Sequence, residues 1–236
     1  MCRQCKQTLA WLITTMLFFA IAIALVAGYV PTEATMGPIQ KIFYLHLPVA
    51  IATFVACLIC FAASVGYALQ RDMKWDRLAS AAARVSVVFC SVVLLTGMIW
   101  GKSAWGQWWT WSPRLTFSLV LWLLYVVYVM VRASVESPQR RAIIAAVYGI
   151  IAFLDVPLVY LSVRLMPDIH PASVELAGSM KLTLIAWFGP VFMLMFGLIA
   201  LRFRIDQRAA ELEKVESEPI TAPGQMTWAG GAGSAL

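Results

Sequence analysis

Six long apolar runs constrain this chain more than any other feature of its sequence. They cover residues 10–30, 49–69, 85–100, 115–131, 142–163 and 182–201. A helix needs about 20 apolar residues to cross roughly 30 Å of hydrocarbon, and the shorter runs can extend into their flanks. Within lipid, the backbone must satisfy its own hydrogen bonds, which favours helices. With 61% hydrophobic and only 13% charged residues, we predict an all-α integral membrane protein with six transmembrane helices.

The basic residues indicate the orientation of these helices. If the N-terminus is cytoplasmic, 13 of the 18 Lys and Arg residues lie inside, as the positive-inside rule requires. We therefore predict both termini in the cytoplasm and a functional face on the outer side. The expected divisions are a cytoplasmic N-terminus (1–9), a transmembrane domain (10–201) and a partly disordered cytoplasmic tail (202–236). The net charge of +6 is then a topology signal, and we expect lipid rather than nucleic acid as a partner. Asp76 and its charged neighbours in the inner connection 70–84 are expected to be solvated.

The outer connection after the third run is exceptionally rich in tryptophan. Half of the ten tryptophans fall within residues 100–111: Trp100, Trp105, Trp108, Trp109 and Trp111. On a helix, the four from Trp105 onward cover an arc of about 160°. Pro113 disfavours helix at the preceding residue, so we predict a two-turn amphipathic helix over 105–112 on the outer membrane surface. Its aromatic face would form a platform for a flat ligand, although an interfacial aromatic belt is the alternative.

The only two histidines, His46 and His170, are both expected on the outer face, next to helix ends. Imidazole is an axial ligand of haem iron, and two imidazoles can hold a planar macrocycle from both sides. Arg114 follows the tryptophans and could pair with a ligand carboxylate or a lipid phosphate. Asp155 lies inside the fifth run, where a carboxylate is costly. It could support the outer site from below, or it could cap backbone groups freed by Pro157.

The segment 105–116 resembles the tryptophan-rich WWD signature of haem-handling membrane proteins. Together with residues 43–48, the Asp-Val-Pro sequence at 155–157, and His170, it resembles the haem exporter protein C (CcmC) family of bacterial cytochrome c maturation. The resemblance covers residues from about 41 to 201. Ser112 departs from the aspartate that the family usually carries there, so any role that needs a carboxylate at that position is in doubt.

The resemblance implies a platform that binds haem b at the periplasmic face of the bacterial inner membrane and presents it to the haem chaperone CcmE. It implies an ABC-type CcmA/CcmB assembly and the small single-span CcmD as further partners. His46 and His170 map onto the axial ligands, and the tryptophans from Trp105 to Trp111 onto the platform. The expected role is haem transfer in cytochrome c biogenesis and not enzymatic catalysis. The alternatives are a b-type electron carrier, which usually holds its histidines inside helices, and a solute permease, which needs a polar path through the bundle.

Overall fold

A computed structural model describes residues 3–33, 36–170 and 176–217 of the chain. Within these residues the regular secondary structure is all helical, as predicted, apart from one isolated bridge between Glu33 and Gly37. The α-helices are α1 (Arg3–Gly28), α2 (Phe43–Gln70), α3 (Met73–Trp105), α4 (Pro113–Ser134), α5 (Pro138–Ala152), α6 (Asp155–Leu165) and α7 (Gly178–Ser217), and a 3₁₀ helix, η1 (Pro38–Ile42), precedes α2. Six helical segments of the described chain are long and apolar enough to cross a membrane, with α5 and α6 together forming one of them. The predicted number of spans is confirmed.

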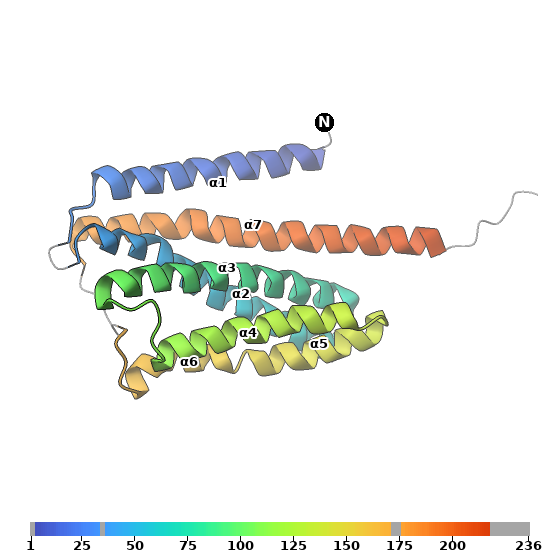
Figure 1. The fold of residues 1–236 in the computed structure, drawn as a ribbon. Helices are drawn as coiled ribbons and strands as arrows, with labels where there is room; N and C mark the ends of the chain where they lie inside the picture. The colour runs from blue at the N-terminus through green and yellow to red at the C-terminus, as the bar shows by residue number, and fades with distance from the viewer. Residues whose placement is uncertain (1–2, 34–35, 171–175, 218–236) are drawn as a thin grey trace, which may run out of the picture.

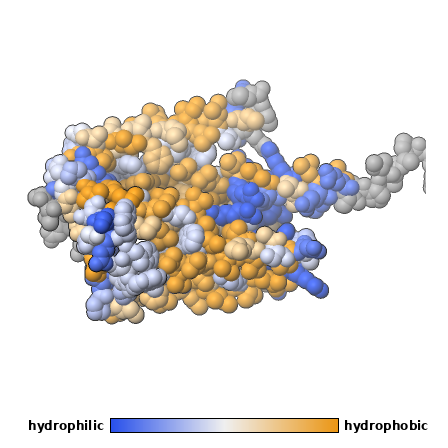
Figure 2. All heavy atoms as spheres, viewed as in Figure 1, coloured by the Kyte–Doolittle hydropathy of each residue, from blue (hydrophilic) through white to orange (hydrophobic). Residues whose placement is uncertain are grey.

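The helices run side by side, as Figure 1 shows. We call the end that carries η1, the end of α3 and the start of α4 the tryptophan end. The start of α1 and the end of α7 both lie at the opposite end (Figure 1). α7 has 40 residues and extends the helix predicted beyond residue 201 to Ser217. Apolar side chains dominate the middle of the surface and polar ones gather towards the ends (Figure 2), as expected for a bundle surrounded by lipid.

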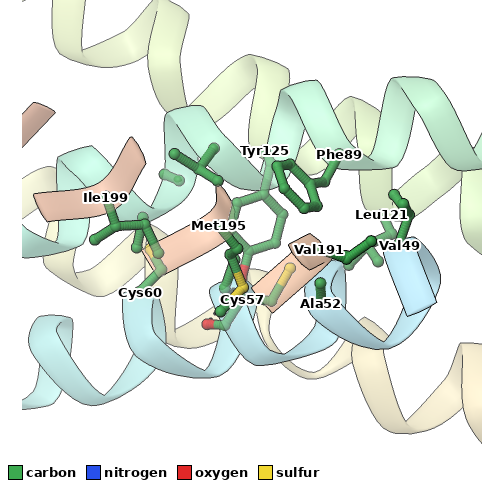
Figure 3. Packing of buried hydrophobic residues seen from close by; sticks show 14 of the residues in the cluster. Val49, Ala52, Cys57, Cys60, Phe89, Leu121, Tyr125, Val191, Met195 and Ile199 are labelled. Carbon is green, nitrogen blue, oxygen red and sulfur yellow. Dashed lines mark hydrogen bonds between the residues drawn. The ribbon is translucent and has the colours of Figure 1, made fainter. Parts of the chain in front are cut away.

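Small residues bring α2 and α3 into close contact. Their buried faces carry alanines at 52, 56, 63, 79, 81, 82 and 83, each at most 2% exposed. Small side chains let helix backbones approach closely, and the resulting van der Waals packing favours helix association in lipid. Figure 3 shows larger residues filling the space beside them: Tyr125 of α4 packs against Cys57 of α2 and Met195 of α7. The Tyr125 hydroxyl donates a 3.4 Å hydrogen bond to the Cys57 carbonyl.

α1 is held to the bundle by tryptophan contacts with α7. Trp11 Nε1 donates to the Met193 carbonyl at 3.1 Å, and Trp187 Nε1 donates to the Ala22 carbonyl at 3.1 Å. A methyl group at Gly197 would overlap the Trp11 indole. The absence of a side chain at Gly197 therefore allows the close approach of α1 to α7.

A buried ion pair lies near the opposite end of the bundle. Asp76 at the start of α3 is 3% exposed and binds Arg132 at the end of α4 through both carboxylate oxygens. The bond between Asp76 Oδ2 and Arg132 Nη2 measures 2.8 Å. The expectation that Asp76 is solvated is therefore wrong. Its polar sequence neighbours suggested solvent exposure, but Asp76 lies in the first turn of α3, on the side that faces α4.

The fifth span is interrupted between α5 and α6. Pro157 has no N–H to donate to the carbonyl four residues earlier, that of Phe153. The Val156 N–H bonds to that carbonyl instead, at 3.1 Å, and Leu154 N–H bonds to the Ile151 carbonyl at 3.0 Å. The proline thus explains why one apolar run becomes two helices.

Candidate functional site

A cavity of about 480 Å³ opens at the tryptophan end, between α2, α3, α4 and α6. Its walls are mainly apolar, and five of the residues expected to form a site line it: His46, Trp105, Trp109, Arg114 and His170. Residues that are up to 124 positions apart in the sequence are thus brought to one cavity. Its volume is typical of small-molecule sites, which span about 300–1,000 Å³.

His46 is held on a helix and not in a loop. η1 leads directly into α2, which begins at Phe43 and places His46 in its first turn. His46 precedes the apolar run that starts at residue 49, but the helix starts before that run, because Pro48 is accommodated inside it. His46 Nδ1 lies 2.8 Å from the Thr96 hydroxyl of α3. A Cβ atom at Gly97 would lie 3.4 Å from His46 Cε1, so this glycine leaves room for the imidazole.

His170 reaches the cavity from the connection after α6. Asp168 fixes this position with its two carboxylate oxygens: Oδ1 accepts the His170 backbone N–H and Oδ2 accepts the Arg114 backbone N–H, each at 2.8 Å. The carboxylate also lies at the start of α4, where unsatisfied N–H groups favour negative charge. Asp168 therefore ties the His170 segment to α4. Asp168 was not identified from the sequence, because its link to Arg114 joins residues 54 positions apart.

Arg114 lies in the first turn of α4 and turns its side chain towards His170. Its Nη1 lies 3.3 Å from His170 Nδ1, and its Nη2 donates to the Tyr160 carbonyl at 3.4 Å. Arg114 and His170 are both partly buried and both line the cavity. The two residues are thus brought together, which the sequence alone did not indicate.

Trp100 links the two histidines. Its ring centroid lies 6.0 Å from that of His46 and 6.2 Å from that of His170, with edge-to-face geometry in both cases. The side chain is only 4% exposed and lines the cavity. Trp100 belongs to the tryptophan cluster of the sequence but was not predicted to form part of the site, because it falls at the end of an apolar run. Its place in that cluster is the sequence signal that could have assigned Trp100 to the site.

The predicted amphipathic helix over 105–112 is wrong. α3 continues to Trp105, where Gly106 ends it in the left-handed conformation at φ 76°. The Gly106 N–H bonds to the Lys102 carbonyl at 3.1 Å and its own carbonyl accepts from Lys102 Nζ at 2.9 Å. Residues 107–112 then form a non-helical connection. Glycine is the residue that most easily ends a helix in this way.

This connection divides the tryptophans into two groups. Trp105 and Trp109 line the cavity, whereas Trp108 and Trp111 do not and are 59% and 75% exposed. Trp109 and Trp111 are in contact, with their ring centroids 5.7 Å apart and their planes at 80°. Only half of the expected platform therefore faces a ligand space.

Asp155 and Ser112 are not among the residues that line the cavity. Asp155 is 6% exposed at the start of α6, and its Oδ2 is buried without a hydrogen-bond partner among the described residues. Ser112 precedes α4 as its N-cap, and its carbonyl accepts the Thr116 N–H at 3.0 Å. Within the described part of the chain, the Ser112 hydroxyl has no partner. Its position at a helix N-terminus is one where a carboxylate would be favoured.

The cavity combines two imidazoles, one guanidinium and aromatic walls. Three buried donor atoms of its lining residues, Trp100 Nε1, Trp109 Nε1 and Arg114 Nε, have no partner among the described residues. Buried donors are usually hydrogen-bonded, so these three atoms suit a ligand that brings acceptors. The arrangement fits a large planar ligand with a metal centre for the imidazoles and an acidic group for Arg114.

Comparisons with known proteins identify similar chains. The sequence model of the family described as "Heme exporter protein C" matches residues 1–219. A protein of that name from Bradyrhizobium diazoefficiens is 33% identical over 178 residues, covering 75% of this chain and 67% of the relative. The Rhodobacter capsulatus protein is 28% identical over 199 residues, covering 80% and 81%. The Escherichia coli K12 protein is 33% identical over 154 residues, covering 64% and 62%.

Proposed function

The chain belongs to the Heme exporter protein C family, and from this premise we propose that it binds haem b in the cavity at the tryptophan end. Its multi-pass helical fold and its family support a role in haem handling for cytochrome c maturation. The observation that carries the proposal is that His46 and His170 line one cavity and both contact Trp100.

His46 and His170 would hold the haem iron as axial ligands. Imidazole nitrogen is a common haem ligand, and a pair of imidazoles can bind the two faces of the macrocycle. Trp100 contacts both histidine rings edge to face. Trp105 and Trp109 would cover the apolar surface of the macrocycle, because stacked and edge-to-face aromatic contacts add to the gain from burial.

Arg114 would bind a propionate group of the haem. Guanidinium and carboxylate groups form strong, directional, charge-assisted hydrogen bonds. The present partners of the Arg114 guanidinium are one imidazole nitrogen and one backbone carbonyl, at 3.3 and 3.4 Å. Both contacts are longer than a good charge-assisted bond, so a carboxylate would compete well for this side chain.

The protein would act as a platform that passes haem on, and not as an enzyme that transforms it. We propose the periplasmic side of the bacterial inner membrane as the place of the cavity, and the chaperone CcmE as the acceptor of the haem. CcmA/CcmB and CcmD would be its assembly partners. The exposed indoles of Trp108 and Trp111 flank the cavity without lining it. Exposed tryptophans are common contact residues in protein interfaces, so these two would meet the acceptor.

Histidine variants test the haem assignment. Purified His46→Ala and His170→Ala proteins should bind haemin more weakly than the wild type and should no longer show its absorption spectrum, because each lacks one of the two proposed iron ligands. Trp111→Phe is the matched control, since it changes an exposed aromatic residue outside the cavity lining. If both histidine variants bind haemin with unchanged affinity and spectra, the assignment is wrong.

One observation favours a second candidate, the b-type electron carrier. His46 lies inside a helix that is able to span the membrane, as the histidines of such carriers do. It lies, however, in the first turn, and His170 lies outside any helix. Reversible reduction of the bound haem by a quinol, at rates unaffected by a haem acceptor, would support the carrier and contradict the platform.

A further inference from the structure

A cleft separates α1 from α7 at the end of the bundle opposite the tryptophans. The two helices touch where Trp11 of α1 lies against Gly197 of α7, and Figure 1 shows them moving apart towards the start of α1. Two adjoining hollows of about 350 and 380 Å³ occupy the space between them, and Arg204 and Arg208 line both. Because α1 packs mainly on α7, the cleft lies where α1 has left its principal partner.

The larger hollow has mostly apolar walls from both helices. Apart from the two arginines, it is lined by Cys5, Thr8, Leu9, Leu12, Leu201 and Ile205. Leu9, Leu12 and Ile205 are exposed although the two helices stand next to each other. Leu12 and Leu201 belong to the first and sixth apolar runs, so this part of the cleft adjoins hydrocarbon. The hollow is therefore suited to an apolar chain.

The smaller hollow is polar and carries a net positive charge. Its walls are Arg204 and Arg208 with Gln7, Gln207 and Glu211. The two arginines are one helical turn apart on α7, so their side chains are neighbours. Both are exposed, and no hydrogen bond or ion pair among the described residues engages either guanidinium. Glu211, the only acidic residue that lines either hollow, lies farther along α7 from the apolar part. Two positive charges thus stand without a counter-charge at the mouth of an apolar hollow.

The two arginines lie at the depth of the lipid headgroups. The sixth apolar run ends at Leu201, and at 1.5 Å per residue Arg204 and Arg208 follow it by about 5 and 10 Å. The headgroup layer on each side of the hydrocarbon core is roughly 5–8 Å thick. Arginine side chains near helix ends reach towards this layer. Both guanidinium groups are therefore within reach of a lipid phosphate.

We propose that the cleft between α1 and α7 binds one anionic phospholipid, with its phosphate between Arg204 and Arg208 and an acyl chain in the apolar hollow. Guanidinium groups bind phosphate through paired, charge-assisted hydrogen bonds. Basic pockets between transmembrane helices are known places for anionic headgroups, whereas the ammonium group of a zwitterionic lipid is repelled by the two arginines. The lipid touches both helices and so fastens α1 to the bundle. This binding is independent of the proposed haem function.

Lipid binding to the purified full-length chain in a neutral detergent tests the headgroup preference. By native mass spectrometry, the wild type should bind dioleoyl phosphatidylglycerol about tenfold or more tightly than dioleoyl phosphatidylcholine. The double variant Arg204→Gln, Arg208→Gln should bind phosphatidylglycerol about 10- to 30-fold more weakly than the wild type. The matched control is Lys74→Gln, Arg140→Gln, which removes two exposed charges from the same end of the bundle and alters neither hollow. It should keep the wild-type preference.

Thermal unfolding gives a second measurement that separates binding from folding. Without lipid, the Arg204→Gln, Arg208→Gln variant should unfold at the wild-type temperature, because both side chains are exposed. Phosphatidylglycerol should raise the Tm of the wild type, since a ligand of the folded state stabilises it, and should leave that of the variant unchanged. Millimolar inorganic phosphate should shift neither.

Three results would overturn the proposal. The first is equal affinity of the wild type for the two lipids, or an unchanged preference in the arginine double variant. The second is an equal rise in Tm with inorganic phosphate, which would indicate a site for a free anion. The third comes from a photo-cross-linking residue in place of Ile205 in native membranes. It should yield lipid adducts, and a cross-link to another protein would assign the cleft to a protein partner instead.

Discussion

Asp168 accepts the backbone N–H of Arg114 at 2.8 Å across 54 positions of sequence. Because its other oxygen accepts the His170 N–H, a single carboxylate sets the relative position of the proposed propionate ligand and one proposed iron ligand. The site therefore depends on a residue that lines no part of the cavity.

Asp168→Ala should weaken haemin binding by about tenfold or more. It removes two hydrogen bonds to a charged acceptor, each worth about 1.5–3 kcal/mol, and about 1.4 kcal/mol corresponds to a factor of ten. The affinity is measured by haemin titration of the purified protein. Asp72→Ala is the control, because Asp72 also accepts a backbone N–H at 2.8 Å, at the start of α3 near the opposite end of the bundle. Equal affinities of the two variants would contradict the role of Asp168.

The tryptophans should fall into two classes when each is replaced by alanine. Trp105→Ala and Trp109→Ala remove walls of the cavity and should each weaken haemin binding by about tenfold, since a large buried side chain contributes roughly 1.5–3 kcal/mol. Trp108→Ala and Trp111→Ala should stay within about twofold of the wild type, because these indoles are exposed and lie outside the lining. A uniform loss across all four variants would indicate a continuous platform instead.

Haemin binding should depend on the space that Gly97 leaves beside His46. Gly97→Leu places a branched side chain where even a Cβ atom would touch the imidazole, and should weaken haemin binding by about tenfold or more. Gly97→Ala should be tolerated, because its contact of 3.4 Å with His46 Cε1 is close to ordinary packing. Gly189→Leu is the control, since an added Cβ at Gly189 meets no atom within 4 Å. The affinity of the three variants is measured by haemin titration. Normal binding by Gly97→Leu would contradict the role of His46 as a ligand in this position.

The buried ion pair should affect stability and not haem affinity. Asp76→Asn leaves the Arg132 charge without its partner and should lower the free energy of unfolding by about 3–5 kcal/mol. Asp206→Asn should cost less than about 1 kcal/mol, because the Arg202–Asp206 pair is partly exposed. Denaturation in mixed micelles measures both. The double variant Asp76→Leu, Arg132→Met should recover much of the stability, and equal losses for the two single variants would show that burial of the pair has no consequence.

The number of spans was predictable because lipid allows few alternatives for a long apolar run. The break after Ala152 could also have been placed, since Pro157 deprives the Phe153 carbonyl of its usual donor. The end of α3 was predicted wrongly because the tryptophan periodicity was given more weight than Gly106, whose left-handed conformation stops the helix.

The main residue types of the site were predictable, but the contacts between them were not. Histidine and tryptophan are rare enough for their gathering to be noticed in the sequence. The links from Thr96 to His46 and from Arg114 to His170 join separate segments, and only the packing of the helices brings these pairs together. The division of the tryptophans into lining and exposed residues likewise depends on the backbone path after Gly106.

The length of α7 has a mechanical consequence. Its 40 residues span about 60 Å, roughly twice the thickness of the hydrocarbon core. It starts at Gly178, eight positions after His170 in the sequence, and its other end extends beyond the neighbouring helices (Figure 1). A force applied to that projecting end therefore acts on one continuous helix that reaches the tryptophan end. Among the described residues of α7, only Pro190 lacks a backbone donor, so any bending of the helix should concentrate there.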